Sequence, residues 1–353
     1  MLGGIVEAGT KVLGGDRFSL LSVLPGAIVV TAVTVLVGAH AYEPGRSMDL
    51  GDALPDDRQL TTLALISAGV FLGGVLLRPF QLALIQYLEG YWPSGTLTGR
   101  LRRIAVERHR RRRDQAEAME GTYTVELPDD NMSLERIRQF HRAVARAERL
   151  KGRSARTCAM YSTNDQNLMP TTLGNILKNV EERTGDRHGI DVLSAYRRIY
   201  PSVKPEFRQA LQEQMDLISV TSSLCVAFGV VSVAASPLVL RMNWWTLVLP
   251  AAMAACALAY RGAQRAAQDN EELMKAVFDV HRFDLATALH YDLPTTPAEE
   301  WALNQRITLF LLSHVPLKDH SALRDEPFKH PEEAPPPAAT PAPAPQLPPP
   351  RQD

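Results

Sequence analysis

The chain has 353 residues, with 38 Lys and Arg against 39 Asp and Glu and a formal net charge of −1. Its mean hydropathy is −0.12, and these averages are ordinary for a soluble protein. Four stretches, however, carry no Lys, Arg, Asp or Glu: 18–42, 59–77, 217–240 and 242–260. Each is long enough to cross a hydrocarbon core of about 30 Å as a helix, which excludes a purely soluble globular protein.

The first two stretches predict a transmembrane hairpin over 18–88, after a cytoplasmic N-terminus at 1–17. Its spans are expected at about 22–40 and 60–77. Ala39-His40-Ala41 resembles a signal-peptidase site, but the apolar run before it is longer than the roughly 7–15 residues of a usual signal sequence. We therefore expect a retained span, with cleavage of residues 1–41 as the alternative.

Small residues on the spans indicate how they associate. Gly69 and Gly73 form a GxxxG pair, and Ala251, Ala255 and Ala259 recur every four residues in the fourth stretch. Such rows let helices approach closely in lipid. Packing within one chain and packing between subunits both remain open.

A basic, mainly helical cytoplasmic region is expected over 89–216, and it begins with eight arginines in 100–113. Lysine and arginine favour the cytoplasmic side, and basic residues attract the anionic inner leaflet. The predicted contacts with the membrane surface are Arg78, Tyr91, Trp92, Arg100, Arg102, Arg103, Arg110, Arg111, Arg112 and Arg113. A protein partner is an alternative ligand for this cluster. Nucleic acid is disfavoured because no aromatic residues are interleaved to stack bases.

Several helices are predicted between the two pairs of spans. An amphipathic helix is expected over 133–151, followed by a loop over 152–170. Thr171 or Thr172 is expected to cap the next helix, and Gly185 is expected to end it. Asp191 is expected to cap a short helix before the chain continues from Pro205 into the third span.

The last two uncharged stretches predict a second hairpin over 217–261, with spans at about 217–240 and 243–260. Trp244 and Trp245 fit a turn at the membrane interface. C-terminal cytoplasmic helices are expected over 262–322, including one that opens on a capping box at Thr296-Pro297-Ala298-Glu299. From Pro331 to Pro350, 10 of 20 residues are proline, so 323–353 is expected to be a disordered, proline-rich tail.

The predicted fold class is therefore an all-α integral membrane protein with four transmembrane helices in two hairpins and a helical cytoplasmic region. The positive-inside rule places both termini in the cytoplasm, and the expected location is the cell (inner or plasma) membrane. The four uncharged stretches contain no Asp, Glu, Lys or Arg, which disfavours a coupled transporter. A pore lined by Ser and Thr, such as Ser222 and Ser223, stays open.

Some segments resemble an uncharacterised group of bacterial integral membrane proteins of the actinobacterial type. The segments are Leu88-Glu89-Gly90-Tyr91-Trp92, Pro170-Thr171-Thr172-Leu173-Gly174-Asn175-Ile176-Leu177, Arg187-His188-Gly189-Ile190-Asp191 and Phe278-Asp279-Val280-His281-Arg282-Phe283-Asp284-Leu285. The pattern is PTxLGN followed by an aromatic-Gly-x-Asp segment, and His188 departs from it by replacing the aromatic residue. The resemblance implies no activity. It marks Glu89, Gly90, Thr171, Gly174, Asn175, Gly189, Asp191, His281 and Asp284 as motif residues of unknown role.

The sequence contains no phosphate-binding, dinucleotide, metalloprotease or nucleophile-elbow motif. It gives no reason to expect a catalytic residue, a cofactor or a metal; a site at His281 and Asp284 is less favoured than surface ion pairs. The leading hypothesis is a membrane-embedded scaffold or recruitment platform that associates with itself or with a cytoplasmic protein. The alternatives are a homo-oligomeric pore and an enzyme with its site near Glu89, Asn175, Asp191 or His281.

Overall fold

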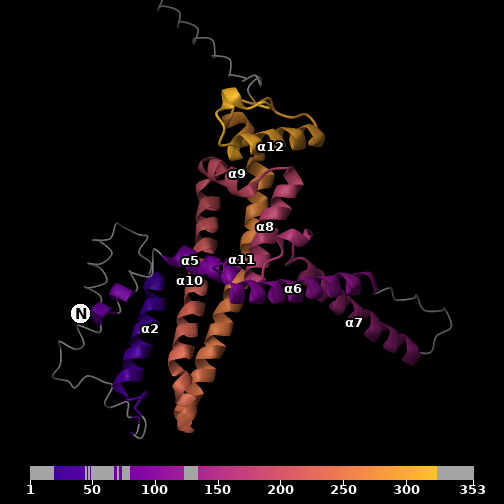
Figure 1. The fold of residues 1–353 in the computed structure, drawn as a ribbon. Helices are drawn as coiled ribbons and strands as arrows, with labels where there is room; N and C mark the ends of the chain where they lie inside the picture. The colour runs from indigo at the N-terminus through magenta and orange to yellow at the C-terminus, as the bar shows by residue number, and fades with distance from the viewer. Residues whose placement is uncertain are drawn as a thin grey trace, which may run out of the picture.

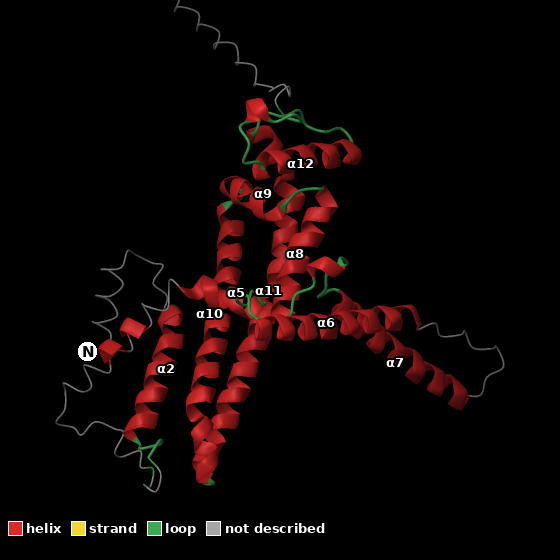
Figure 2. Ribbon diagram, viewed as in Figure 1, coloured by secondary structure: helices red, strands yellow, loops and turns green. Residues whose placement is uncertain are grey.

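The structure, a computed structural model, describes residues 20–43, 46, 48, 67–69, 71–73, 80–122 and 134–323. Within these ranges every regular element is helical (Figure 2), which confirms the predicted all-α fold. The N-terminal 19 residues, most of the second predicted span and the proline-rich tail lie outside the described residues.

Two long antiparallel helices organise the molecule (Figure 1): α10 (Pro205–Ala235) and α11 (Val248–Ala288). They are joined by the short 3-10 helices η4 (Ser236–Arg241) and η5 (Trp244–Leu247). Each arm of this hairpin is long and apolar enough to cross a membrane. As predicted, α10 starts at Pro205 and continues without a break into the third uncharged stretch.

A third apolar helix, α2 (Leu20–Gly38), packs beside α10. Leu36 and Ala41 form an apolar cluster with Ala235 and Leu238, so the C-terminal ends of α2 and α10 lie together. We call α2 and residues 217–260 of the hairpin the apolar end of the molecule. Of the four predicted spans, the described part of the chain therefore shows two helices of full spanning length. It also shows a shorter apolar helical stretch, Val23–Gly38, within α2.

The opposite end of the hairpin carries a helical head. It consists of α8 (Thr172–His188), α9 (Val192–Ile199) and α12 (Pro297–Leu312), packed on the remaining parts of α10 and α11 (Figure 1). Its core is built from large apolar side chains that include Ile199, Leu211, Val277, Phe278 and Ile307. A second cluster below it joins the start of α8 to Ile218 and to alanines of α11.

Between the head and the apolar end, α5 (Gln81–Glu89) and α6 (Thr96–Thr122) run across the hairpin instead of along it (Figure 1). The next helix, α7 (Leu134–Cys158), packs against α6. The level of this crossing is marked by Tyr260, the last residue of the fourth uncharged stretch, whose hydroxyl accepts a hydrogen bond from the Leu173 amide at the start of α8.

Two predicted helix ends and one missing helix require correction. The expected loop over 152–170 is wrong at its start, because α7 continues to Cys158; arginines such as Arg153 and Arg156 are good helix formers. The sequence predicts a mainly helical region over 89–216 but gives no bounds for a helix around 100–113; these arginines lie on α6. Gly185 does not end α8. It lies inside the helix, where a Cβ would stand 2.6 Å from the Ile190 carbonyl oxygen, and Gly189, with φ of 68°, is the C-cap.

Candidate functional site

The first part of the site is a junction between the end of α5 and the start of α8. The Thr171 hydroxyl donates to the Glu89 carbonyl oxygen at 2.8 Å and accepts from the Gly174 amide at 3.0 Å, so it also caps α8. A Cβ on Gly174 would lie 2.0 Å from the Glu89 oxygen, and one on Gly90 would lie 2.2 Å from Pro170 Cγ. Both glycines are therefore required for the close approach of the two segments.

Asn175 completes this junction from inside. Its side chain is fully buried; its oxygen accepts from the Met169 amide at 2.9 Å, and its amide group donates to the Met169 and Thr171 carbonyl oxygens at 2.7 Å each. Five motif residues of unknown role, at 89, 90, 171, 174 and 175, thus meet in one place. Their contacts hold the backbone of the two segments together, and the Asn175 side-chain nitrogen already donates two hydrogen bonds.

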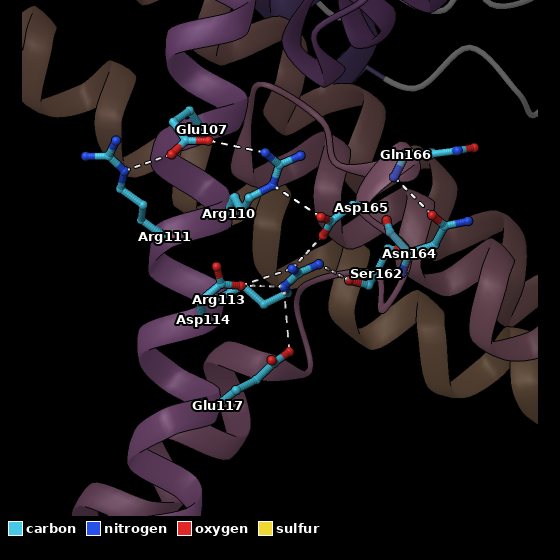
Figure 3. Close-up of polar contacts among 10 residues, drawn as sticks. All are labelled: Glu107, Arg110, Arg111, Arg113, Asp114, Glu117, Ser162, Asn164, Asp165 and Gln166. Carbon is cyan, nitrogen blue, oxygen red and sulfur yellow. Dashed lines mark hydrogen bonds and ion pairs between the residues drawn. The ribbon is translucent and has the colours of Figure 1, made fainter.

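The second part of the site is the face of α6 that contacts the loop before α8 (Figure 3). Arg113 is buried there; its guanidinium donates to Asp165 at 2.6 Å and to the Ser162 carbonyl oxygen at 3.3 Å. The hydrogen bond from Arg113 holds the pKa of Asp165 below its usual value. Arg113 therefore ties α6 to the loop, and the prediction that it contacts the membrane surface is wrong because the side chain is turned inward.

The other arginines of α6 divide into two groups. Arg110 pairs with Glu107 at 3.3 Å and with Asp165 at 3.4 Å, and Arg111 pairs with Glu107 at 2.9 Å. Among the described residues, no ion pair joins a carboxylate to the remaining arginines, which are Arg100, Arg102, Arg103, Arg108 and Arg112. Arg108, which was not among the predicted contacts, belongs to this second group.

A cleft of about 1110 Å³ opens between α6 and the start of α8. It is lined by apolar and polar residues of α6 and by Trp92, Pro170 and Thr172, and its charged lining residues are Glu107, Arg108, Arg111 and Arg112. His109 also borders it, with Nδ1 3.0 Å from the Tyr161 hydroxyl. Burial, followed by the nearby Arg112 and Arg108, lowers the pKa of His109. At neutral pH the positive charge of the cleft therefore comes from the arginines.

The other motif residues lie elsewhere in the head. Asp191 caps α9 by accepting from the Ser194 amide at 2.9 Å, as predicted. Gly189 lies against Trp301, where a Cβ would be 2.6 Å from Trp301 Cδ1. His281 and Asp284 pair with each other at 2.8 Å on α11. These residues therefore do not join the junction of Glu89 and Thr171.

A charged cluster around His188 was missed by the sequence analysis. His188 is buried, and its two ring nitrogens lie 3.0 Å from Asp279 and 3.1 Å from Glu300, which also pairs with Arg282 at 2.8 Å. Because both neighbours are carboxylates, both nitrogens donate only in the imidazolium form. The cluster joins α8, α11 and α12. Its one sequence signal was the replacement of the expected aromatic residue by His188.

The small residues of the apolar end have different surroundings. A Cβ on Gly73 would lie 3.1 Å from Val30 of α2, so the GxxxG pair faces α2. In the fourth uncharged stretch the buried alanine is Ala252, whereas Ala251 is exposed and Ala255 and Ala259 are half-buried. The row of alanines is therefore displaced from the centre of the contact with α10.

The polar side chains expected along a pore are also turned inward. Ser222 and Ser223 are buried within the helix assembly. The thiols of Cys225 and Cys256 lie 3.6 Å apart, between α10 and α11. This arrangement places small side chains, instead of a polar lumen, between the two helices.

Arg78 lies outside the described residues, whereas Tyr91 is exposed and Trp92 donates from its ring nitrogen to the Tyr87 carbonyl oxygen at 3.0 Å. Within the described ranges, no group of three or more His, Cys, Asp or Glu side chains is placed to hold a metal ion. No protein-family model, curated protein or solved structure matches this chain.

Proposed function

We propose that this protein is a four-span inner-membrane protein that acts as a scaffold, presenting its helical head in the cytoplasm as a platform for a protein partner or a second copy. The observation that carries the proposal is the continuity of α10 and α11 from the apolar end into the head. Two unbroken helices couple the head rigidly to the membrane-embedded part.

The exposure of the apolar end supports a lipid environment. In the most apolar window of each arm, only 33% of α10 and 11% of α11 is buried, whereas the core helix of a soluble protein is mostly buried. The 41 residues of α11 span about 60 Å at 1.5 Å per residue. A hydrocarbon core takes about 30 Å of that length, so the rest of α11 extends into the head.

Charges and aromatic residues support the orientation. The arginine-rich α6 lies at the boundary between the apolar end and the head (Figure 1), where lysine and arginine favour the cytoplasmic side. At the opposite tip, the rings of Trp244 and Trp245 stack with centroids 4.0 Å apart, a placement typical of membrane interfaces. Both termini are then cytoplasmic, and the anionic inner leaflet contacts α6.

The head offers an apolar surface for a partner. Trp301, Leu309 and Leu312 are exposed and, by helical spacing, lie on one side of α12. A neighbouring apolar residue, Leu293, is exposed too. Large exposed apolar patches on soluble regions mark protein-binding surfaces.

The platform is tested by purifying the tagged, full-length protein from native membranes into nanodiscs and measuring its native mass. We expect a second copy or another protein to remain bound. The double substitution Leu309→Ser, Leu312→Ser should release it, whereas Leu193→Ser, at an exposed position of α9, should not. A protein that is monomeric and alone in every preparation would exclude the platform. A multimer that conducts ions in liposomes would favour the homo-oligomeric pore instead.

The topology is tested separately by cysteine labelling in a variant without the three native cysteines. An impermeant maleimide should label Asp49→Cys in cells with an intact inner membrane. It should label Asp129→Cys only after the inner membrane is permeabilised. The reverse pattern would overturn the orientation, and labelling of both positions would overturn the multi-pass arrangement.

A further inference from the structure

The two sides of α6 have different roles. Leu101 precedes Arg110 by nine residues, and Ile104 precedes Arg113 by nine. At 3.6 residues per turn this separation is two and a half turns, so each leucine or isoleucine points away from its arginine partner. Arg110 and Arg113 contact Asp165 in the loop before α8. Leu101 and Ile104 therefore lie on the side of α6 opposite that loop.

This opposite side faces the apolar end of the molecule. In Figure 2 the loop before α8 lies on the head side of α6, so the side turned away from the loop points toward the apolar end. Its large apolar residues are strongly exposed: Leu97 at 69%, Leu101 at 50% and Ile104 at 67%. Exposure of such large apolar side chains to water is unfavourable in free energy.

Two cations follow the apolar residues on the same side of the helix. Arg108 comes one turn after Ile104, and Arg112 one turn after Arg108. Both are exposed and both line the cleft beside Trp92. Among the described residues neither forms an ion pair with a carboxylate, in contrast to Arg110 and Arg113, although Glu107, which pairs with Arg110 and Arg111, lines the same cleft. The cleft therefore combines two guanidinium groups that have no carboxylate partner in the described ranges with an apolar approach from the membrane side.

We propose that this cleft binds the phosphate of an anionic phospholipid headgroup. Arg108 and Arg112 hold the phosphate oxygens, because guanidinium groups donate paired hydrogen bonds to phosphate. Leu97, Leu101 and Ile104 lie in the upper acyl region, and Trp92 lies at headgroup level. The inference rests on the proposed membrane location and names a lipid site within it.

A soluble phosphate compound shares the same charged chemistry, but it would not use the exposed apolar residues. The lipid explains both halves of the surface, since its headgroup and acyl chains are covalently joined. Burial of the apolar side chains in lipid removes the cost of their exposure to water. The cleft is therefore expected to prefer a phospholipid over inorganic phosphate.

The test measures lipid retained by the full-length protein in detergent, using native mass spectrometry with added phosphatidylglycerol or phosphatidylcholine. The wild type should retain phosphatidylglycerol preferentially. Arg108→Gln with Arg112→Gln should reduce this retention about tenfold or more, the loss expected for one charge-assisted hydrogen bond. The matched control, Arg102→Gln with Arg103→Gln, removes the same charge from other sides of α6 and should change retention less than about twofold.

Further arms identify the source of the phosphate. Leu101→Ser with Ile104→Ser should weaken retention of phosphatidylglycerol, and millimolar inorganic phosphate should not displace the lipid from the wild type. Equal losses in both arginine pairs would show general charge attraction and overturn the site. Displacement by inorganic phosphate would show a soluble phosphate site instead. The wild type could also retain phosphatidylglycerol and phosphatidylcholine equally while its cysteine labelling still shows a multi-pass protein. That result would overturn this inference and leave the proposed function standing.

Discussion

The apolar end and the head are built on the same two helices, yet their interiors and exteriors are reversed. In the apolar end, α10 and α11 meet through small side chains such as Ala227, Ala252 and the Cys225–Cys256 pair, and large residues such as Leu258 face outward. In the head, large residues such as Phe278 fill the interior, and ion pairs join the outer helices.

The reversal shows where each half derives its stability. In water, burial of large apolar side chains is the main driving force. In lipid that force between helices is absent, and close packing of small residues replaces it. Under the proposed membrane location of the apolar end, one continuous helix pair serves both solvents because the size of the buried side chains changes along its length.

The largest expected effect is the difference in free energy of unfolding between two truncations of apolar side chains, one in each half. Phe278→Ala empties a fully buried position of the head and should lower its free energy of unfolding by about 3–5 kcal/mol. Val233→Ala truncates a residue of the apolar end that is 74% exposed and should change it by no more than about 0.5 kcal/mol. Thermal unfolding of the purified protein measures both. Similar losses would contradict the contrast between the halves.

The next effect concerns the junction of α5 with the start of α8, which lies between the two halves. Gly174→Ala brings a methyl group against the Glu89 carbonyl oxygen, and such overpacking should cost about 1–3 kcal/mol. The control is Gly152→Ala on α7, where no atom lies within 4 Å of the added Cβ; it should stabilise the helix by up to about 1 kcal/mol. Limited proteolysis between α5 and α8 reports the difference. Equal protection of the two variants would refute the close approach.

A smaller effect comes from the charge of Glu89. Burial, and then the nearby Glu181, raises the pKa of this carboxyl group above its usual 4.5. The folded state therefore binds more protons than the unfolded state above pH 4.5, and stability is lost as the pH rises through the folded-state pKa. Glu89→Gln should be the more stable form at pH 7, with its advantage disappearing toward pH 4.5. A pH-independent difference would show that the carboxylate charge is not its cause.

The last contrast concerns a cross-link in the apolar end, and it is read from thiol reactivity instead of stability. Because the Cys225 and Cys256 thiols are 3.6 Å apart, a membrane-permeant oxidant should join them within one chain. The measurement is the loss of two maleimide-reactive thiols per chain, with Cys158 still reactive. In the control Cys225→Ser, no intrachain bond should form. Cross-linking between chains instead would place the pair at a subunit contact.

Local features of the fold could be predicted from the sequence. The caps at Thr171, Asp191 and Thr296 depend on residues three positions away, so their pattern is readable in a short window. In the last case the structure adds a refinement, because the Glu299 carboxylate also accepts hydrogen bonds from the backbone amide and the hydroxyl of Thr295.

The site could not be predicted in the same way, because its contacts join distant residues. Arg113 and Asp165 are 52 positions apart, and Thr171 and Glu89 are 82 apart. No periodic pattern distinguishes an arginine held by such a contact from one that is free. The sequence therefore groups seven of the eight arginines, all but Arg108, into one predicted membrane contact, whereas the structure separates Arg110, Arg111 and Arg113 from Arg108 and Arg112.

Arg241 at the tip of the hairpin has a consequence for biogenesis. Its guanidinium donates to the carbonyl oxygens of His40, Glu43 and Arg46, at 2.8, 2.6 and 2.8 Å, and these residues are made about 200 positions earlier. At a synthesis rate of about 5–20 residues per second, they wait some 10–40 s for their donor. The segment that follows α2 thus obtains these hydrogen bonds only after the tip of the α10–α11 hairpin has been made, so the order of synthesis is part of the architecture.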